Sequence, residues 1–181
     1  MQMSTPAWVQ LDSDDPMLGG YMELALPTNW ILGVGPRRTL SMIYNDLYVR
    51  EYKWWGFIAD DVVPETPEFD VKLIESAGED GMAVPDGGNG TPHFVLGKNL
   101  PLLTGWLSLP GLSRLYIDTV WGDIAGALGV LRRNTNVVLK HHHFSNRLAL
   151  MDETYRKPLK AKDRALYEAW KMVDFPKIRG G

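Results

Sequence analysis

Two adjacent carboxylates, Asp60 and Asp61, directly follow the apolar run Trp54–Ala59. Neighbouring anions repel each other, so such a pair is best tolerated beside a cation or a cationic side chain. Mg²⁺ and Mn²⁺ prefer oxygen ligands, and Mg²⁺ is often held by one or two carboxylates together with substrate phosphates. The pair therefore indicates a divalent-cation site at the end of a strand. The alternative is a solvated turn in which Asp61 caps a local backbone group.

A run of three histidines, His141 to His143, offers further metal ligands at the end of the predicted strand Asn136–Lys140. Alternate side chains of an extended segment share one face, so His141 and His143 point together and His142 points away. Neutral imidazole is a common metal ligand. Beside a cation held by the acidic pair, one of these two histidines would supply another ligand.

Asp118 precedes a predicted amphipathic helix on which Val120, Ile124 and Leu128 share one face. An aspartate at such a place commonly caps the helix by accepting a hydrogen bond from a backbone N–H group. The functional alternative is a general base that removes a proton from an acceptor hydroxyl. The sequence leaves both interpretations open.

Two arginines, Arg37 and Arg38, come after the turn Gly35-Pro36 and before a helix predicted from Thr39. Backbone N–H groups at a helix start, together with two guanidinium groups, suit a diphosphate. Gly-Pro turns are common, however, so this pattern has little specificity.

An acidic turn that contains Asp12, Asp14 and Asp15 ends the first predicted strand. These carboxylates would bind a ribose hydroxyl or a base edge, or belong to a simple turn. Trp106 and Trp121 are candidate platforms for stacking a sugar ring, with core packing as the simpler interpretation.

The elements that must position these groups follow from the pattern of apolar residues. Strands are predicted at Pro6–Leu11, Trp30–Gly35, Trp54–Ala59, Met82–Val84 and Asn136–Lys140. Helices are predicted from Thr39 to Leu47, from Thr66 to Ala77, from Leu100 to Leu107, after Asp118, and in the tail along Leu166, Ala169, Trp170 and Val173. Because strands alternate with helices, we expect one α/β domain with a Rossmann-like, mostly parallel central sheet flanked by helices. Ligands of such sheets gather at the carboxyl ends of the strands, where the charged groups fall.

The composition limits the class of protein. The chain has 181 residues, 45% of them hydrophobic, which suffices for one globular domain, and it has no run long enough to span a membrane. It contains no cysteine, which excludes disulfides and thiolate metal sites. No basic region followed by an apolar stretch occurs near Met1, so we expect no signal peptide and a cytoplasmic location.

The net charge of −3 is unevenly distributed. Residues 1–90 carry a net charge of −10, residues 91–155 carry +2, and residues 156–181 carry +5. The acidic front half argues against a protein that binds nucleic acid over its whole surface. The basic tail is either a solvated helix face or a surface that touches phosphates.

Five motifs in order resemble those of compact phage and bacterial glycosyltransferases with a GT-A fold. They are Asp14-Asp15-Pro16; Gly56-Phe57-Ile58-Ala59-Asp60-Asp61 with Pro64 and Thr66-Pro67-Glu68-Phe69-Asp70 behind it; Leu115-Tyr116-Ile117-Asp118-Thr119-Val120-Trp121; His141-His142-His143; and Asp152-Glu153-Thr154-Tyr155. The resemblance covers about Thr5 to Trp170 and begins at the family's second strand, so the usual first strand and loop are lacking. Ala59 stands where the family usually has glycine.

The resemblance implies a GT-A-like catalytic domain over residues 1–155, with a basic helical tail, residues 156–181, packed on it. Asp61 and His141 or His143 would hold a divalent cation, Mn²⁺ or Mg²⁺, that bridges the donor diphosphate. Asp14, Asp15, Arg37, Arg38 and Asp60 would lie at the nucleotide-sugar donor, and Asp118 would be the base of an inverting transfer. A second copy or a partner subunit would replace the lacking segment.

We therefore expect a metal-dependent glycosyltransferase that moves a sugar from a nucleotide-sugar donor to an acceptor hydroxyl. By analogy with the family, modified phage DNA or a virion protein is a conceivable acceptor, and the basic tail suits DNA. A phage-encoded enzyme would act in the host cytoplasm. Two alternatives stay open: a non-catalytic GT-A-like domain that binds a nucleotide, a nucleotide sugar or a protein partner, and a metal-dependent hydrolase built on the same side chains.

Overall fold

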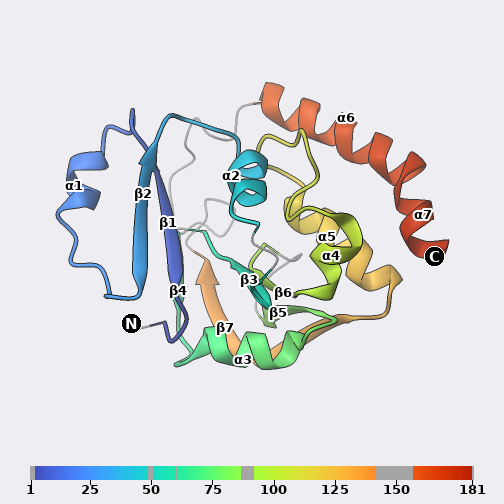
Figure 1. Cartoon of the computed structure of the whole chain (residues 1–181), viewed down its shortest axis with the longest axis horizontal. Helices are drawn as coiled ribbons and strands as arrows, with labels where there is room; N and C mark the ends of the chain where they lie inside the picture. The colour runs from blue at the N-terminus through green and yellow to red at the C-terminus, as the bar shows by residue number, and fades with distance from the viewer. Residues whose placement is uncertain (1–2, 49–50, 60, 87–91, 142–156, 181) are drawn as a thin grey trace.

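The computed structural model describes residues 3–48, 51–59, 61–86, 92–141 and 157–180. Figure 1 shows a two-stranded sheet at one end of the molecule, a five-stranded sheet in the middle and the C-terminal helices at the other end. The strands are β1 (Ala7–Asp12), β2 (Trp30–Gly35), β3 (Trp54–Phe57), β4 (Val62–Pro64), β5 (Met82–Asp86), β6 (Phe94–Gly97) and β7 (Leu131–His141). The helices are α1 (Leu18–Met22), α2 (Leu40–Asp46), α3 (Phe69–Ala77), α4 (Asn99–Thr104), α5 (Ile117–Ala127), α6 (Lys157–Val173) and α7 (Phe175–Gly180).

The two-stranded sheet pairs β1 with β2 in parallel, from Ala7 opposite Trp30 to Asp12 opposite Gly35. The predictions of both strands are confirmed to within one residue at each end. The indole of Trp8 lies close over β2, because a Cβ at Gly33 would stand only 2.6 Å from its Cζ2 atom. A larger residue at this glycine would displace the indole.

The main sheet has the strand order β3-β6-β5-β7-β4 and is mixed, mostly antiparallel. Only β5 and β7 run parallel, whereas β6 runs antiparallel to β3 and to β5, and β4 runs antiparallel to β7. The prediction of a GT-A-like, Rossmann-like, mostly parallel sheet is therefore wrong. The error has a physical origin: the short strands β4 and β6 have no recognisable sequence pattern, and both run against their neighbours.

The main sheet is curled into a half-barrel. Its edge strands are β3 and β4, and yet only residues 58–61 separate them in the sequence. Five Cα–Cα steps reach at most about 18 Å, whereas four strand spacings in a flat sheet amount to about 19 Å. Because this connection is too short to span a flat sheet of five strands, it favours a curled sheet in which β3 and β4 lie closer together. A bulge of β7, opposite Pro85 and Asp86, allows additional bending.

The strand β5 shows how the two faces of the main sheet are filled. Met82 and Val84 belong to one apolar cluster together with Trp121 of α5. Ala83 belongs to the other cluster together with Phe69 of α3. Because alternate side chains of a strand face opposite sides, β5 contributes to the core on both faces.

Predicted helices occur with shifted starts. Thr39 caps α2, and its hydroxyl accepts a hydrogen bond from the N–H of Met42 (3.3 Å). The helix α3 begins at Phe69 instead of directly after Thr66, since Glu68 adopts a left-handed conformation with φ of 53°. Thr66 instead serves the bulged strand β7, where its hydroxyl accepts from the N–H of Val138 (2.8 Å). As predicted, none of the described helices is long and apolar enough to cross a membrane.

The helix α6 packs into the first core cluster through Tyr167 and Trp170, which are 7% and 5% exposed. The predicted apolar stripe is right at Leu166 and Trp170, which pack in this cluster, but Ala169 and Val173 are exposed. The face that α6 buries differs from the predicted one, because it includes the carboxylate of Asp163, which is 0% exposed. The tail is thus joined to the core through a polar as well as an apolar face.

Candidate functional site

The carboxyl ends of β1 and β2 bring two predicted donor-binding segments together. The N–H of Ser13 donates to the carbonyl of Gly35 (2.7 Å) and extends the pairing into both turns. The Nε atom of Arg37 lies 3.3 Å from a carboxylate oxygen of Asp14 and 3.5 Å from one of Asp12. The side chains of Arg37 and Asp14 are 60% and 63% exposed, so this pair can exchange its partners at little cost.

The two other charged residues of these turns have local partners. The carboxylate of Asp15 accepts a hydrogen bond from the N–H of Met17 (2.7 Å), next to the start of α1. Arg38 forms an ion pair with Asp46 at the end of α2. Within this part of the site, Arg37 is therefore the cation most readily offered to a diphosphate.

The helix α2 connects the segment Arg37-Arg38 to the loop that leads into α5. The N–H of Leu40 donates to the carbonyl of Ser113 (2.9 Å). The amide of Asn45 binds the backbone of Ser108, accepting from its N–H and donating to its carbonyl, both at 2.9 Å. These contacts fix both ends of α2 against the segment that carries Asp118 into its helix.

Asp118 lies in the first turn of α5 and is not the N-cap residue, which is Tyr116. Its carboxylate is half-buried, and the hydroxyl of Thr119 donates to it at 3.5 Å. Burial raises the pKa of the Asp118 carboxyl, although hydrogen bonds from the backbone N–H groups of Thr119 and Asp118 lower it in part. A carboxylate with a raised pKa is a stronger base, which is the property that proton removal requires.

Asp61 stands directly before β4, beside the end of β7. Antiparallel pairing sets Val62 opposite His141, so Asp61 lies one residue beyond that pair. Asp60, His143 and the side chain of His141 lie outside the described part of the structure. Among the side chains that the structure describes, no group of three or more potential ligands could hold a metal ion. Backbone pairing nevertheless brings the two predicted metal-binding segments to one edge of the main sheet.

The segments that carry the predicted donor, metal and base residues come from separate elements. Figure 1 shows the arrowheads of β2 and β7 pointing the same way, with α2 beside them on the side of the C-terminal helices and α5 farther toward those helices. The predicted donor, metal and base residues are therefore carried by the β1–β2 turns, the β4–β7 edge and the start of α5, respectively.

Comparison with models of known protein families gives no match, and comparisons with curated proteins and with solved structures likewise give none. The functional argument therefore depends on the residues and the geometry described above.

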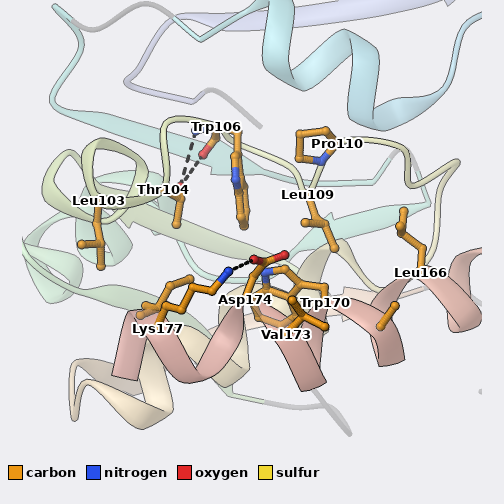
Figure 2. Close-up of a pocket in the computed structure, with 12 residues that line it drawn as sticks. Leu103, Thr104, Trp106, Leu109, Pro110, Leu166, Trp170, Val173, Asp174 and Lys177 are labelled. Atoms are coloured by element: carbon orange, nitrogen blue, oxygen red, sulfur yellow. Dashed lines mark hydrogen bonds and ion pairs between the residues drawn. The ribbon is translucent and has the colours of Figure 1, made fainter. Parts of the chain in front are cut away.

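A cavity of about 630 Å³ lies elsewhere, between the segment Leu103–Pro110 and the helices α6 and α7. Figure 2 shows Trp106 on one wall and Trp170 on the other, with the ion pair of Asp174 and Lys177 (2.8 Å) beside them. None of the described residues predicted to bind the donor diphosphate or the metal, or to act as the base, lines it. Of the two tryptophans considered for sugar stacking, Trp106 lines this cavity, whereas Trp121 is 0% exposed and belongs to the core.

Sequence reasoning missed two buried carboxylates, Asp70 and Asp163, which hold distant segments together. Asp163 accepts hydrogen bonds from three backbone N–H groups of the loop before α5. Asp163 is one of three acidic residues, with Glu168 and Asp174, in a tail that carries eight basic ones. The partners of such a carboxylate are backbone groups, however, and these have no sequence signature.

Proposed function

We propose that the protein is a metal-dependent glycosyltransferase that moves a sugar from a nucleotide-sugar donor to an acceptor hydroxyl. The observation that carries the proposal is the pairing of Val62 with His141, which brings the backbone of Asp61 close to that of His141. Carboxylate oxygen and imidazole nitrogen together fit Mn²⁺, and the carboxylates also suit Mg²⁺. Such a cation would neutralise the charge that develops on the diphosphate leaving group.

Asp118 supplies the proton acceptor in this proposal. It is half-buried at the start of α5, and burial raises the pKa of its carboxyl. In a transfer with inversion, the acceptor hydroxyl gives its proton to Asp118 while its oxygen bonds to the anomeric carbon. The bond from that carbon to the diphosphate oxygen breaks, and the leaving group keeps the electron pair.

Arg37 and Arg38 bind the donor diphosphate in this proposal, with Asp60, Asp14 and Asp15 nearby. Arg37 exchanges its exposed contact with Asp14 for a phosphate oxygen, to which a guanidinium can donate two parallel hydrogen bonds. Because Arg38 is paired with Asp46, it holds the start of α2 in place as well as adding positive charge.

The proposal also includes the acceptor of the sugar and the location of the protein in the cell. The helix α6 exposes Lys160, Lys162 and Arg164, which suit a phosphate-bearing acceptor such as modified DNA, with a virion protein as the alternative. The absence of cysteine is compatible with a cytoplasmic location.

The proposal is tested by incubating the protein with a panel of nucleotide sugars and Mn²⁺ and measuring the release of nucleoside diphosphate. Asp61→Asn is compared with Glu75→Gln, an exposed acid on α3 that serves as the matched control. Losing a metal ligand removes several kcal/mol of transition-state stabilisation, so Asp61→Asn should lose at least about 100-fold in kcat. Glu75→Gln should keep the activity of the wild type.

Full activity of Asp61→Asn would refute the assignment of the metal. Thermal-shift titration with nucleoside diphosphates and Mn²⁺ provides the second measurement. Binding without turnover would replace the transferase with a nucleotide-binding module, and cleavage of the donor without any acceptor would replace it with a hydrolase.

A further inference from the structure

The basic tail carries a row of three side chains that reaches the helix of Asp118. Asp163, Tyr167 and Lys171 are spaced four residues apart on α6, so they lie along one face of that helix. All three contact either α5 or the loop that precedes it.

Asp163 holds the loop before α5 through its carboxylate. One oxygen accepts a hydrogen bond from the N–H of Ser113 (2.8 Å), and the other accepts from the N–H groups of Arg114 and Leu115 (2.9 Å each). The side chain is 0% exposed, and a buried carboxylate is stable only when its oxygens are satisfied in this way. Three consecutive residues of the loop are therefore fixed by one carboxylate on α6.

Tyr167 holds the next part of the chain. Its ring stacks on that of Tyr116, with centroids 5.0 Å apart and an interplanar angle of 17°. Tyr116 has a positive φ of 68°, which is unfavourable for a bulky residue and persists only where its surroundings impose it. The hydroxyl of Tyr167 also donates to Asp123 of α5 (2.6 Å), and Lys171 donates to that hydroxyl (2.9 Å) and lies 2.9 Å from the Asp123 carboxylate.

We propose that Asp163 and Tyr167 are positioning residues for Asp118, because they determine where α5 begins and how its first turn is oriented. Every residue from Ser113 to Tyr116 is held by one of these two side chains, and Asp118 follows two residues later. The tail is accordingly an integral part of the site, whatever its exposed face binds. The catalytic consequence rests on the proposed function, but the placement of Asp118 does not.

The experiment measures the titration of the Asp118 carboxyl by carbon-detected NMR in the full chain. The variants are Asp163→Asn, which retains the shape but loses the charge, and Tyr167→Phe, which retains the ring stacking but loses the hydroxyl. Glu168→Gln, which makes the same acid-to-amide change at an exposed position of the same helix, is the matched control. We expect the pKa of Asp118 to fall toward its ordinary value in Asp163→Asn, less so in Tyr167→Phe, and to stay unchanged in Glu168→Gln.

In the transfer assay, kcat should fall by about 100-fold in Asp163→Asn, as is typical of a catalytic group displaced by about 1 Å. The affinity for a nucleoside diphosphate with Mn²⁺ should change far less than kcat, since the donor residues lie on other elements and reach this loop only indirectly, through the contact of Leu40 with Ser113. An unchanged titration of Asp118 in a folded Asp163→Asn protein would overturn the inference. If that variant does not fold, Tyr167→Leu, which removes the ring stacking on Tyr116, decides by the same two criteria. A shifted titration in a protein that transfers no sugar would support the positioning and refute the proposed function.

Discussion

Asp70 on α3 holds Thr5 through two hydrogen bonds to one carboxylate oxygen, from the backbone N–H and from the hydroxyl, both 2.8 Å long. The residues are 65 positions apart in the chain, and the side chain of Asp70 is 4% exposed. Asn29 adds a hydrogen bond from its amide to the carbonyl of Thr5 (2.8 Å). The segment before β1 is therefore joined both to β2 and to the main sheet's covering helix.

We expect Thr5→Val to destabilise the protein, because it removes a hydroxyl that donates to a buried carboxylate while keeping the shape of the side chain. Hydrogen bonds to charged groups contribute about 1.5–3 kcal/mol each, and urea denaturation would measure this loss in the free energy of unfolding. Hydrogen exchange of the Ala7–Asp12 amides should accelerate. Ser4→Ala, at the exposed neighbouring position, should change neither quantity.

Asp118→Asn should remove proton transfer and yet stabilise the protein at neutral pH. Burial raises the pKa of Asp118 in the folded state, so the folded protein binds this proton more tightly than the unfolded chain does. The wild type therefore loses stability as the pH rises from the ordinary pKa of aspartate to the raised one. The advantage of Asp118→Asn, measured by thermal denaturation over a pH series, should be largest above that window and vanish below it. An advantage that is constant across the series would contradict the raised pKa.

The sequence predicts those strands whose own residues form an apolar run that ends in a recognisable turn. The apolar run Trp30–Gly35 ends in a Gly-Pro turn and is a strand exactly over those residues. The meeting of Asp14 with Arg37 is likewise accessible from the sequence, because the carboxyl ends of two parallel strands lie at one edge. Both features depend on short-range signals and on one rule of sheet geometry.

The features that prediction misses depend on partners distant in sequence. The strand β6 has only four residues, Phe94–Gly97, and its antiparallel direction is set by its neighbours β3 and β5. The strand β4 has three residues and includes Pro64. The N-cap of α5 is at Tyr116, where a left-handed backbone is held by stacking on Tyr167, so the helix includes Asp118. No pattern within these segments shows such contacts.

Gly97→Ala tests the packing that holds β6 in the main sheet. A Cβ at Gly97 would overlap the carbonyl oxygen of Gly78 and the backbone of Glu79, which cannot move aside as a flexible side chain could. We expect a loss of at least about 2 kcal/mol in the free energy of unfolding, as for other overpacked sites. Gly56→Ala in the adjacent strand β3 is the matched control, because its Cβ would meet Val95 at an ordinary 3.7 Å. Equal stability of the two variants in urea denaturation would contradict the close approach.

Asp14→Asn should increase the affinity for a nucleoside diphosphate, because it removes one of the two carboxylates paired with Arg37 at the carboxyl ends of β1 and β2 and leaves only that of Asp12. The pair is screened by solvent, so the gain should be modest, about two- to fivefold in Kd by calorimetric titration. Arg37→Gln should weaken the same binding and make it less sensitive to salt, since one cation is lost from the site. Asp86→Asn, which removes an exposed carboxylate at the end of β5, separates this local effect from a change in net charge. If Asp14→Asn and Asp86→Asn raise the affinity equally, Arg37 does not bind the diphosphate and the donor site lies away from the β1–β2 turns.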